Sequence, residues 1–326
     1  MRKLLKIVGI VAVVLVTLVG LIILYIFLKY PDVGKPTNLS VEATPARLAR
    51  GQYLATHVAI CITCHSQRNT ALWSEPTVPT TEGMGGYLLD EQEEVPGVVV
   101  AKNITPAGIG TMTDGELFRA ITSGVRKNGE AMFPVMPYPA FNKMSDEDLY
   151  SIIAYIRTLR PIENDVPDHQ LDFPLNFIVK MMPAPHVTIQ PPDTSYQYEY
   201  GQYLVNAAGC IDCHSQKVRG EPIKGLEFAG GFEFRYPWGT VRSANITPDV
   251  ESGIGSWTAD DFVGRFEQYA MADSSTLAAL AAEYNSPMPW VAFSGMSERD
   301  LTDIYKYLRT VPPVKNQVEK FTPAKK

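Results

Sequence analysis

The chain has 326 residues, of which 45% are hydrophobic and 20% are charged, a length and composition that suit two or three globular domains with apolar cores. The first 29 residues hold four of the 29 basic residues and no acidic residue, so the remainder carries 25 basic and 35 acidic residues and a formal charge of −10. An acidic body argues against nucleic-acid binding and favours a partner with a basic docking surface.

An uncharged run of 22 residues extends from Ile7 to Leu28. As a helix it would span about 33 Å, enough to cross the hydrocarbon core of a bilayer. A cleaved signal peptide fits less well, because the run is too long and no small-x-small cleavage site follows it. We therefore expect residues 1–29 to be a cytoplasmic N-terminus and membrane anchor, inserted in the lipid bilayer through residues 7–28. The basic residues before the run favour a cytoplasmic N-terminus, with everything after Lys29 exported.

Four sequence blocks recur in the same order about 150 residues apart, which indicates a tandem duplication. The pairs are GQYLATHVAICITCHSQ with GQYLVNAAGCIDCHSQ, NITPAGIG with NITPDVESGIG, VMPYPAF with PMPWVAF, and MSDEDLYSIIAYIRT with MSERDLTDIYKYLRT. The first copy of the first block has one additional residue. We predict two domains of roughly 115 residues, at 45–161 and 196–313. A linker at 30–44, a proline-rich connector at 162–195 and a polar tail at 314–326 complete the chain.

The first and last blocks of each copy predict helices. Thr44 is a suitable N-cap, and Pro45 follows it at the first helical position. Ser145 and Ser297 are the expected N-caps of the two last helices, because each precedes apolar residues at helical spacing. The middle of each copy is rich in glycine and proline and predicts loops with a short hairpin. The fold class expected from these patterns is mainly α.

Two further features predict contacts between elements. Gly51 and Gly201 occupy equivalent places, where a missing side chain would let the first and last helices cross closely against Tyr155 and Tyr307. The apolar middle of the connector, FPLNFIVKMM, is expected to pack against one or both domains. The two NITP segments are expected to form turns.

All four cysteines lie in two motifs in which two residues separate the thiols and a histidine follows at once. The motifs are Cys61-Cys64-His65 and Cys210-Cys213-His214. A disulfide redox motif needs no adjacent histidine, and a zinc site needs further ligands that the two copies do not share. Covalent haem attachment uses every residue, since the thiols bond to the vinyl groups and the histidine coordinates the iron. The sequence therefore predicts two covalently bound haem c groups.

The second axial ligand of each iron decides between an electron carrier and an enzyme. Two methionine pairs keep the register of the repeat, Met136 with Met288 and Met144 with Met296. Met144 and Met296 immediately precede the serine N-caps, where an apolar residue packs on the first helical turn. Met136 and Met288 lie in loops and precede prolines that favour an extended backbone. We therefore predict Met136 and Met288 as the iron ligands. His/Met ligation suits electron transfer and leaves no open position on the iron.

The order GQYL, CxxCHSQ, NITP, GIG, MPYPAF, MSDEDL, YIRT resembles the class I cytochrome c domains in the cytochrome subunits of bacterial membrane-bound dehydrogenases. Those subunits serve quinoprotein alcohol dehydrogenases and flavoprotein sugar or sugar-acid dehydrogenases, and typically carry three haem domains, whereas this chain has two motifs. The resemblance implies two tandem class I cytochrome c domains after one transmembrane helix. It also implies thioether bonds at Cys61, Cys64, Cys210 and Cys213, with axial pairs His65–Met136 and His214–Met288.

These expectations describe an electron carrier or an electron-transfer subunit, with no catalytic residues of its own. We expect it in the bacterial cytoplasmic (inner) membrane as a single-pass protein with both haem domains on the periplasmic side. The donor would be a membrane dehydrogenase or a quinol-oxidising complex, and the acceptor a terminal oxidase or a soluble cytochrome. Two alternatives stay open: a dihaem enzyme (a peroxidase or a sulfur-compound oxidase), and a haem-based sensor. The first needs an open iron position, and the second needs an output domain after Pro313.

Overall fold

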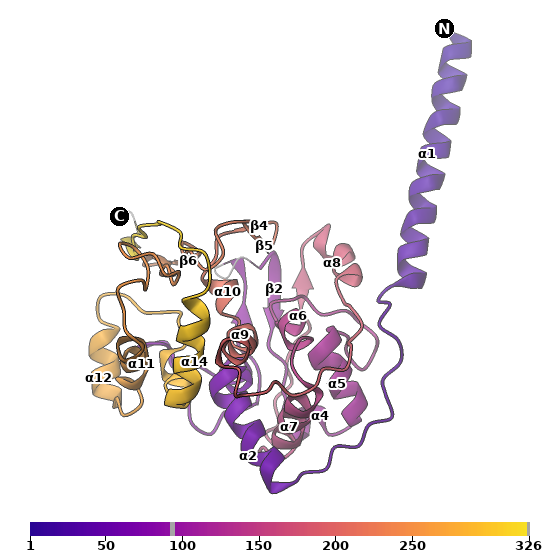
Figure 1. The fold of residues 1–326 in the computed structure, drawn as a ribbon. Helices are drawn as coiled ribbons and strands as arrows, with labels where there is room; N and C mark the ends of the chain where they lie inside the picture. Colours follow the sequence, from indigo (N-terminus) through magenta and orange to yellow (C-terminus); the bar gives the residue numbers. More distant parts are fainter. Residues whose placement is uncertain (92–94, 325–326) are drawn as a thin grey trace.

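The long helix α1 (Arg2–Lys29) projects away from the rest of the chain (Figure 1), and Phe27 near its C-terminal end contacts Phe177 of the connector. The computed structural model describes residues 1–91 and 95–324. None of the residues of α1 is buried, and its most apolar segment has a mean hydropathy of 3.3. Within the described residues it is the one helix that is long and apolar enough to cross a membrane. Its length and composition would allow it to span a bilayer.

In each repeat the first helix packs across the last helix. The four helices are α2 (Pro45–Tyr53) and α7 (Asp146–Ile156) in the first repeat, and α9 (Gln197–Ala207) and α14 (Glu298–Leu308) in the second. The predicted N-caps are confirmed, because side-chain oxygens accept hydrogen bonds from the backbone amides three residues later. These caps are Thr44, Ser145 and Ser297.

The helix crossings are close because a glycine lies at each one. A Cβ added to Gly51 would lie 1.8 Å from the carbonyl oxygen of Ser151, and one added to Gly201 would lie 2.0 Å from that of Asp303. The same added atoms would lie 2.9 and 3.0 Å from the Cβ atoms of Tyr155 and Tyr307. The predicted role of the two glycines is confirmed.

The remaining helices are short and surround these crossed pairs (Figure 1). The first repeat contributes α3 (Cys61–Cys64), α4 (Pro106–Ile109), α5 (Asp114–Ser123) and α6 (Tyr138–Phe141). The second contributes α10 (Cys210–Cys213), α11 (Ala259–Glu267), α12 (Ser274–Leu280) and α13 (Trp290–Phe293). The connector holds α8 (Leu175–Ile178), which continues as a 3₁₀ turn, Val179–Met181.

Among the described residues, three small antiparallel sheets complete the fold. They are β1 (Leu88–Leu89), β2 (Gly97–Val100) and β3 (Gln170–Leu171) in that order; β4 (Lys217–Val218) with β5 (Glu221–Pro222); and β6 (Glu233–Tyr236), β7 (Gly239–Arg242) and β8 (Phe321–Pro323) in that order. Each repeat has the expected hairpin. The third strand of each three-stranded sheet comes from beyond the predicted domain, β3 from the connector and β8 from the tail. The domain limits at 161 and 313 stay predictions, and the repeated pairing continues past both.

The two NITP segments form the expected turns and extend the symmetry. The Asn103 carboxamide oxygen accepts hydrogen bonds from the Thr105 amide and hydroxyl at 2.9 and 2.7 Å, and its NH₂ group donates to the Ile162 carbonyl at 2.8 Å. Asn245 makes the same two bonds within its own turn and donates to the Val314 carbonyl at 2.7 Å. Each turn therefore holds the segment that follows the last helix of its repeat.

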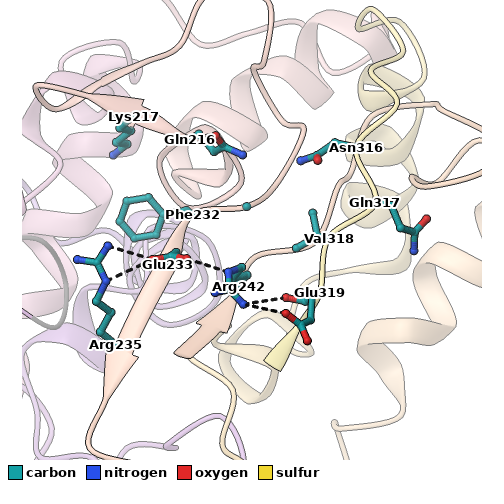
Figure 2. Close-up of a pocket in the computed structure, with 11 residues that line it drawn as sticks. Gln216, Lys217, Phe232, Glu233, Arg235, Arg242, Asn316, Gln317, Val318 and Glu319 are labelled. Carbon is teal, nitrogen blue, oxygen red and sulfur yellow. Dashed lines mark hydrogen bonds and ion pairs between the residues drawn. The ribbon is translucent and has the colours of Figure 1, made fainter. Parts of the chain in front are cut away.

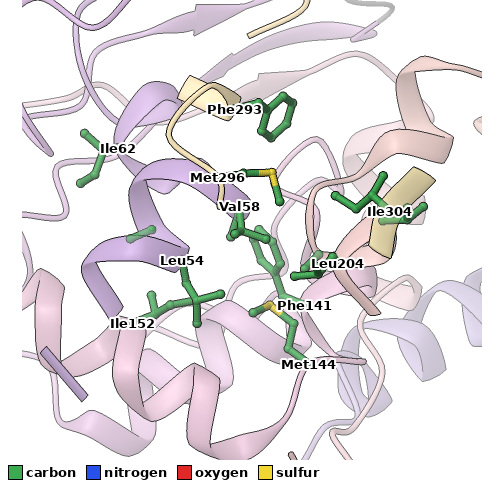
Figure 3. Packing of buried hydrophobic residues seen from close by; sticks show 14 of the residues in the cluster. Leu54, Val58, Ile62, Phe141, Met144, Ile152, Leu204, Phe293, Met296 and Ile304 are labelled. Atoms are coloured by element: carbon green, nitrogen blue, oxygen red, sulfur yellow. The ribbon is translucent and has the colours of Figure 1, made fainter. Parts of the chain in front are cut away.

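The two repeats share one hydrophobic core (Figure 3). Figure 3 shows Met144 and Phe141 of the first repeat near Met296, Phe293 and Leu204 of the second. Met144 is 1% exposed and Met296 is 6% exposed, as expected for methionines that pack on the helix starts. The repeats are thus joined by a common interior.

The additional residue of the first repeat is accommodated in a π-helix, Leu54–Val58. One residue inserted into a helix in this way leaves the helical segments on both sides intact. His57 lies in this turn, and its Nδ1 is 2.8 Å from the carbonyl oxygen of Ala292 in the second repeat. A Cβ added to Gly295 would lie 2.1 Å from the same ring. The π-helix therefore contributes to the contact between the repeats.

The apolar part of the connector packs less than expected. Val179 is 4% exposed and packs inward, whereas Phe173, Ile178 and Met181 are 85%, 38% and 40% exposed. The expectation that this segment packs against the domains therefore holds for only part of it.

Candidate haem sites

Each CxxCH motif forms one helical turn that is entered through a left-handed residue. The residue before α3 is Ile60 with φ 43°, and the residue before α10 is Gly209 with φ 66°. Glycine adopts this conformation freely, whereas a β-branched residue is strained in it. The His65 and His214 amides donate to the carbonyls of the first cysteine of each motif at 2.9 Å. This bond closes the turn that carries both thiols and the imidazole.

The two motif histidines are oriented by the same backbone contact. His65 Nδ1 lies 2.6 Å from the carbonyl oxygen of Lys102, and His214 Nδ1 lies 2.7 Å from that of Ala244. Because a carbonyl only accepts, Nδ1 carries the hydrogen and Nε2 keeps its lone pair. Burial lowers the pKa of both imidazoles, although these hydrogen bonds act in the opposite direction. The neutral ring with a fixed Nδ1–H is the form that coordinates a metal.

The cysteines of the motifs are protonated thiols in this environment. Burial raises the pKa of Cys61 and of Cys210 to about 12. Burial also raises the pKa of Cys64.

The predicted methionine ligands lie at the margin of the shared core, together with Cys61 and Cys210. Met136 precedes α6 and Met288 precedes α13, and the proline after each forms an inverse γ-turn, with φ −77° and ψ 49° in the first repeat and φ −79° and ψ 61° in the second. The amide two residues later donates to each methionine carbonyl, at 2.6 and 2.8 Å. The two loops therefore have the same conformation, while the other methionine pair is buried in the core (Figure 3).

A buried hydroxyl beside the first methionine loop fits a bound cofactor. Tyr138 is 2% exposed, burial raises its pKa to about 12, and its hydroxyl has no hydrogen-bond partner among the residues that the structure describes. Such a donor suits a group that carries carboxylates, as haem does. Within residues 1–91 and 95–324, no three His, Cys, Asp or Glu side chains gather to hold an ion, which disfavours a zinc site. The free Nε2 atoms, the paired thiols and the Tyr138 hydroxyl together fit haem.

Two cavities lie near the second motif. The larger, of about 420 Å³, is an open polar groove next to Gln216, and Figure 2 shows its charges paired across β6, β7 and the tail. Glu233 lies 3.0 Å from Arg235 and 2.9 Å from Arg242. The smaller, of about 300 Å³, is more apolar and includes Ile211 of the motif and Phe228. Neither cavity is lined by His214 or Met288.

A comparison with known families identifies the second repeat. The cytochrome c family matches residues 198–312. These residues form a cytochrome c domain. The match includes the second CxxCH motif, the second methionine loop and most of the crossed helices α9 and α14. A cytochrome c domain binds haem c covalently through such a motif.

Most of the chain is similar to cytochrome subunits of dehydrogenases. It is 29% identical to the cytochrome c subunit of a quinone alcohol dehydrogenase from Gluconobacter oxydans, over 84% of this chain and 56% of that protein. It is 29% identical to a fructose dehydrogenase cytochrome subunit from Gluconobacter japonicus, over 83% and 55%. It is 25% identical to a diheme cytochrome c-type protein from Cereibacter sphaeroides, over 78% and 82%. The chain spans little more than half of the length of the first two.

Proposed function

We propose that the chain is a membrane-anchored dihaem cytochrome that transfers electrons, and that both repeats are class I cytochrome c domains. The observation that carries this proposal is the repeated histidine geometry: His65 and His214 both donate through Nδ1 to a backbone carbonyl and keep Nε2 free. The family match to the second repeat supports the assignment of that domain. The first repeat has the same helix crossing, the same NITP turn and the same Met-Pro turn, which supports extending the assignment to it.

The residues of each repeat have distinct roles in this proposal. Cys61, Cys64, Cys210 and Cys213 would hold haem c through thioether bonds. His65 with Met136, and His214 with Met288, would bind the two irons. When bound, haem supplies one-electron transfer, and His/Met ligation favours a high reduction potential. The backbone carbonyls orient the imidazoles, the γ-turns position the thioethers, and the shared core excludes water.

The proposed location and partners are supported by α1 and by the relatives. We place α1 in the bacterial inner membrane, with Arg2, Lys3 and Lys6 in the cytoplasm and the body in the periplasm. Because the relatives in Gluconobacter are dehydrogenase subunits, we propose a membrane dehydrogenase as electron donor. A quinol-oxidising complex is the other donor class, and a terminal oxidase or a soluble cytochrome is the acceptor. Purification from native membranes in mild detergent, followed by identification of the co-purifying protein, separates these donors.

Methionine substitutions test the ligand assignment. Met136→Leu and Met288→Leu should each remove the sulfur–iron charge-transfer band of one haem and lower its reduction potential, because the thioether ligand is lost. Met144→Leu is the matched control: it exchanges similar volumes in the core and should leave both bands and both potentials unchanged. If Met136→Leu and Met288→Leu behave like the control, the ligand assignment is wrong. If one unsubstituted site instead binds peroxide or carbon monoxide readily, a dihaem enzyme replaces the carrier.

A further inference from the structure

We propose that the connector segment 173–181, which contains α8, inserts its exposed apolar side chains into the surface of the same bilayer that α1 crosses. This segment, named here the α8 patch, consists of the exposed residues Phe173, Ile178 and Met181, with Lys180 beside them. The proposal rests on the membrane anchor of the proposed function. It adds a second membrane contact that holds the globular body at the lipid surface.

The first observation is the position of α8 beside the end of α1 (Figure 1). The rings of Phe27 and Phe177 lie 5.7 Å apart, and Lys180 Nζ lies 3.9 Å from the centre of the Phe27 ring. Phe27 is in the last turn of α1, where the uncharged run ends at Leu28. These contacts therefore fix α8 at the depth at which the span leaves the hydrocarbon core and enters the headgroup region.

The second observation is what α8 exposes at that depth. Phe173 is 85% exposed, and Ile178 and Met181 are 38% and 40% exposed, although Val179 between them is 4% exposed. One side of the segment is thus attached to the body while the other presents large apolar side chains. Exposure of these apolar side chains to water is unfavourable. At a bilayer surface the same residues bury apolar area, and a neighbouring lysine lies at the level of lipid phosphates.

The residues around the end of α1 are of the kinds found at a membrane–water interface. Tyr25 and Tyr30 flank Phe27, and aromatic side chains concentrate at membrane–water interfaces. Lys29 follows and pairs with Asp32 at 2.6 Å. The body as a whole is acidic, so general electrostatic attraction to anionic lipids does not hold it at the surface. Apolar insertion at the α8 patch supplies the contact.

The linker between α1 and the first repeat is attached to that repeat, so the globular repeats cannot move freely away from the end of α1. Although residues 30–44 contain no helix or strand, the Val41 amide donates to Asp114 at 2.8 Å, and Gly115 packs against the Thr37 backbone. The second half of the linker is therefore attached to the first repeat. The α8 contacts then attach the repeat to the end of α1 itself. The expected result is a body with a fixed face toward the membrane, within reach of a membrane-embedded partner.

Spin labels on the full chain in lipid vesicles test the proposal. Single variants Phe173→Cys and Ile178→Cys carry the label, and Met271→Cys is the aqueous control because Met271 is 94% exposed on the second repeat. Labels at 173 and 178 should collide with oxygen freely and with a water-soluble nickel complex several-fold less than the label at 271. Burial in protein would instead lower collision with both reagents. The unsubstituted chain, treated in the same way, gives the background from the native cysteines.

A label in α1 separates this proposal from the anchor itself. Val14→Cys should be accessible to oxygen and inaccessible to nickel if α1 spans the bilayer. If labels at 173 and 178 collide with nickel as readily as the label at 271, while the label at 14 is protected, the α8 proposal is overturned and the anchor stands. If the label at 14 is also accessible to nickel, the anchor is wrong. Vesicles of pure lipid contain no protein partner, so protection there identifies lipid as the occupant.

Discussion

The Tyr53 hydroxyl donates a 2.6 Å hydrogen bond to the Asp300 carboxylate and so joins the first helix of one repeat to the last helix of the other. The same hydroxyl accepts a bond from the Ser297 amide at 3.1 Å. Tyr203 repeats the arrangement in the opposite direction, with Asp148 at 2.6 Å and the Ser145 amide at 3.2 Å. Each repeat thus completes the N-terminus of a helix in its neighbour. The duplicated domains are related by reciprocal contacts as well as by sequence.

Removing one of these hydroxyls should weaken the whole molecule. Tyr53→Phe should lower the free energy of unfolding by about 2 kcal/mol, because the Asp300 carboxylate loses a hydrogen bond at a partly buried interface. Tyr203→Phe should have a similar effect. Denaturant unfolding of the full chain in detergent measures both. The control is Tyr198→Phe, an exposed position, with an expected change below about 0.5 kcal/mol. Equal effects at positions 53 and 198 would show that the bond adds no stability.

The helix crossings should not tolerate even one methyl group. Gly51→Ala and Gly201→Ala should each cost about 3 kcal/mol, since the added Cβ meets backbone atoms that cannot rotate away. Gly264→Ala in α11 is the matched control, because an added Cβ there meets nothing within 4 Å. Helix propensity predicts that it stabilises by about 0.5–1 kcal/mol. Thermal unfolding distinguishes these outcomes, and a neutral Gly51→Ala would contradict the close crossing.

Asp303 should reduce stability at neutral pH. Its carboxylate is buried without a hydrogen-bond partner among the described residues, and burial raises its pKa, although Lys306 and Arg299 at 3.7 and 3.8 Å act against this. A carboxyl whose pKa is higher in the folded state binds its proton more tightly there. The destabilising effect of Asp303 on the folded chain therefore decreases as the pH falls through its folded-state pKa toward its unfolded-state pKa of about 4.

Asp303→Ser tests this, because serine is the residue at the equivalent position 151 of the first repeat. At pH 7 the variant should have a free energy of unfolding roughly 1 kcal/mol higher than the unsubstituted chain and should unfold at a higher denaturant concentration. Near pH 4 most of this difference should be lost. Asp172→Ser, at an exposed position, should show little change at either pH. A destabilised Asp303→Ser at pH 7 would mean that the ion pairs outweigh the burial.

The sequence predicted the features that depend on local patterns. The N-caps at Ser145 and Ser297, the glycines at the crossings, the buried Met144 and Met296, and the apolar helix α1 all carry a signal within a few residues of themselves. The carbonyls that orient the motif histidines carry none, because any residue supplies a backbone acceptor. Lys102 and Ala244 were therefore found only in the structure.

Other features depend on segments that meet only in the folded chain. The strands β3 and β8 are two and three residues long and pair with partners far away in the sequence, so their own residues do not predict them. The additional residue of the first repeat was visible, but its π-helix and the contact of His57 with the second repeat were not. The contact between α8 and α1 likewise joins segments about 150 residues apart, which periodicity does not relate.

Magnetic circular dichroism of the purified, oxidised full chain, with its haem content measured on the same sample, tests the central claim most directly. The account predicts two haems per chain, both low-spin, each with the near-infrared transition of methionine–histidine ligation. One haem per chain, or a five-coordinate high-spin iron at rest, would contradict it.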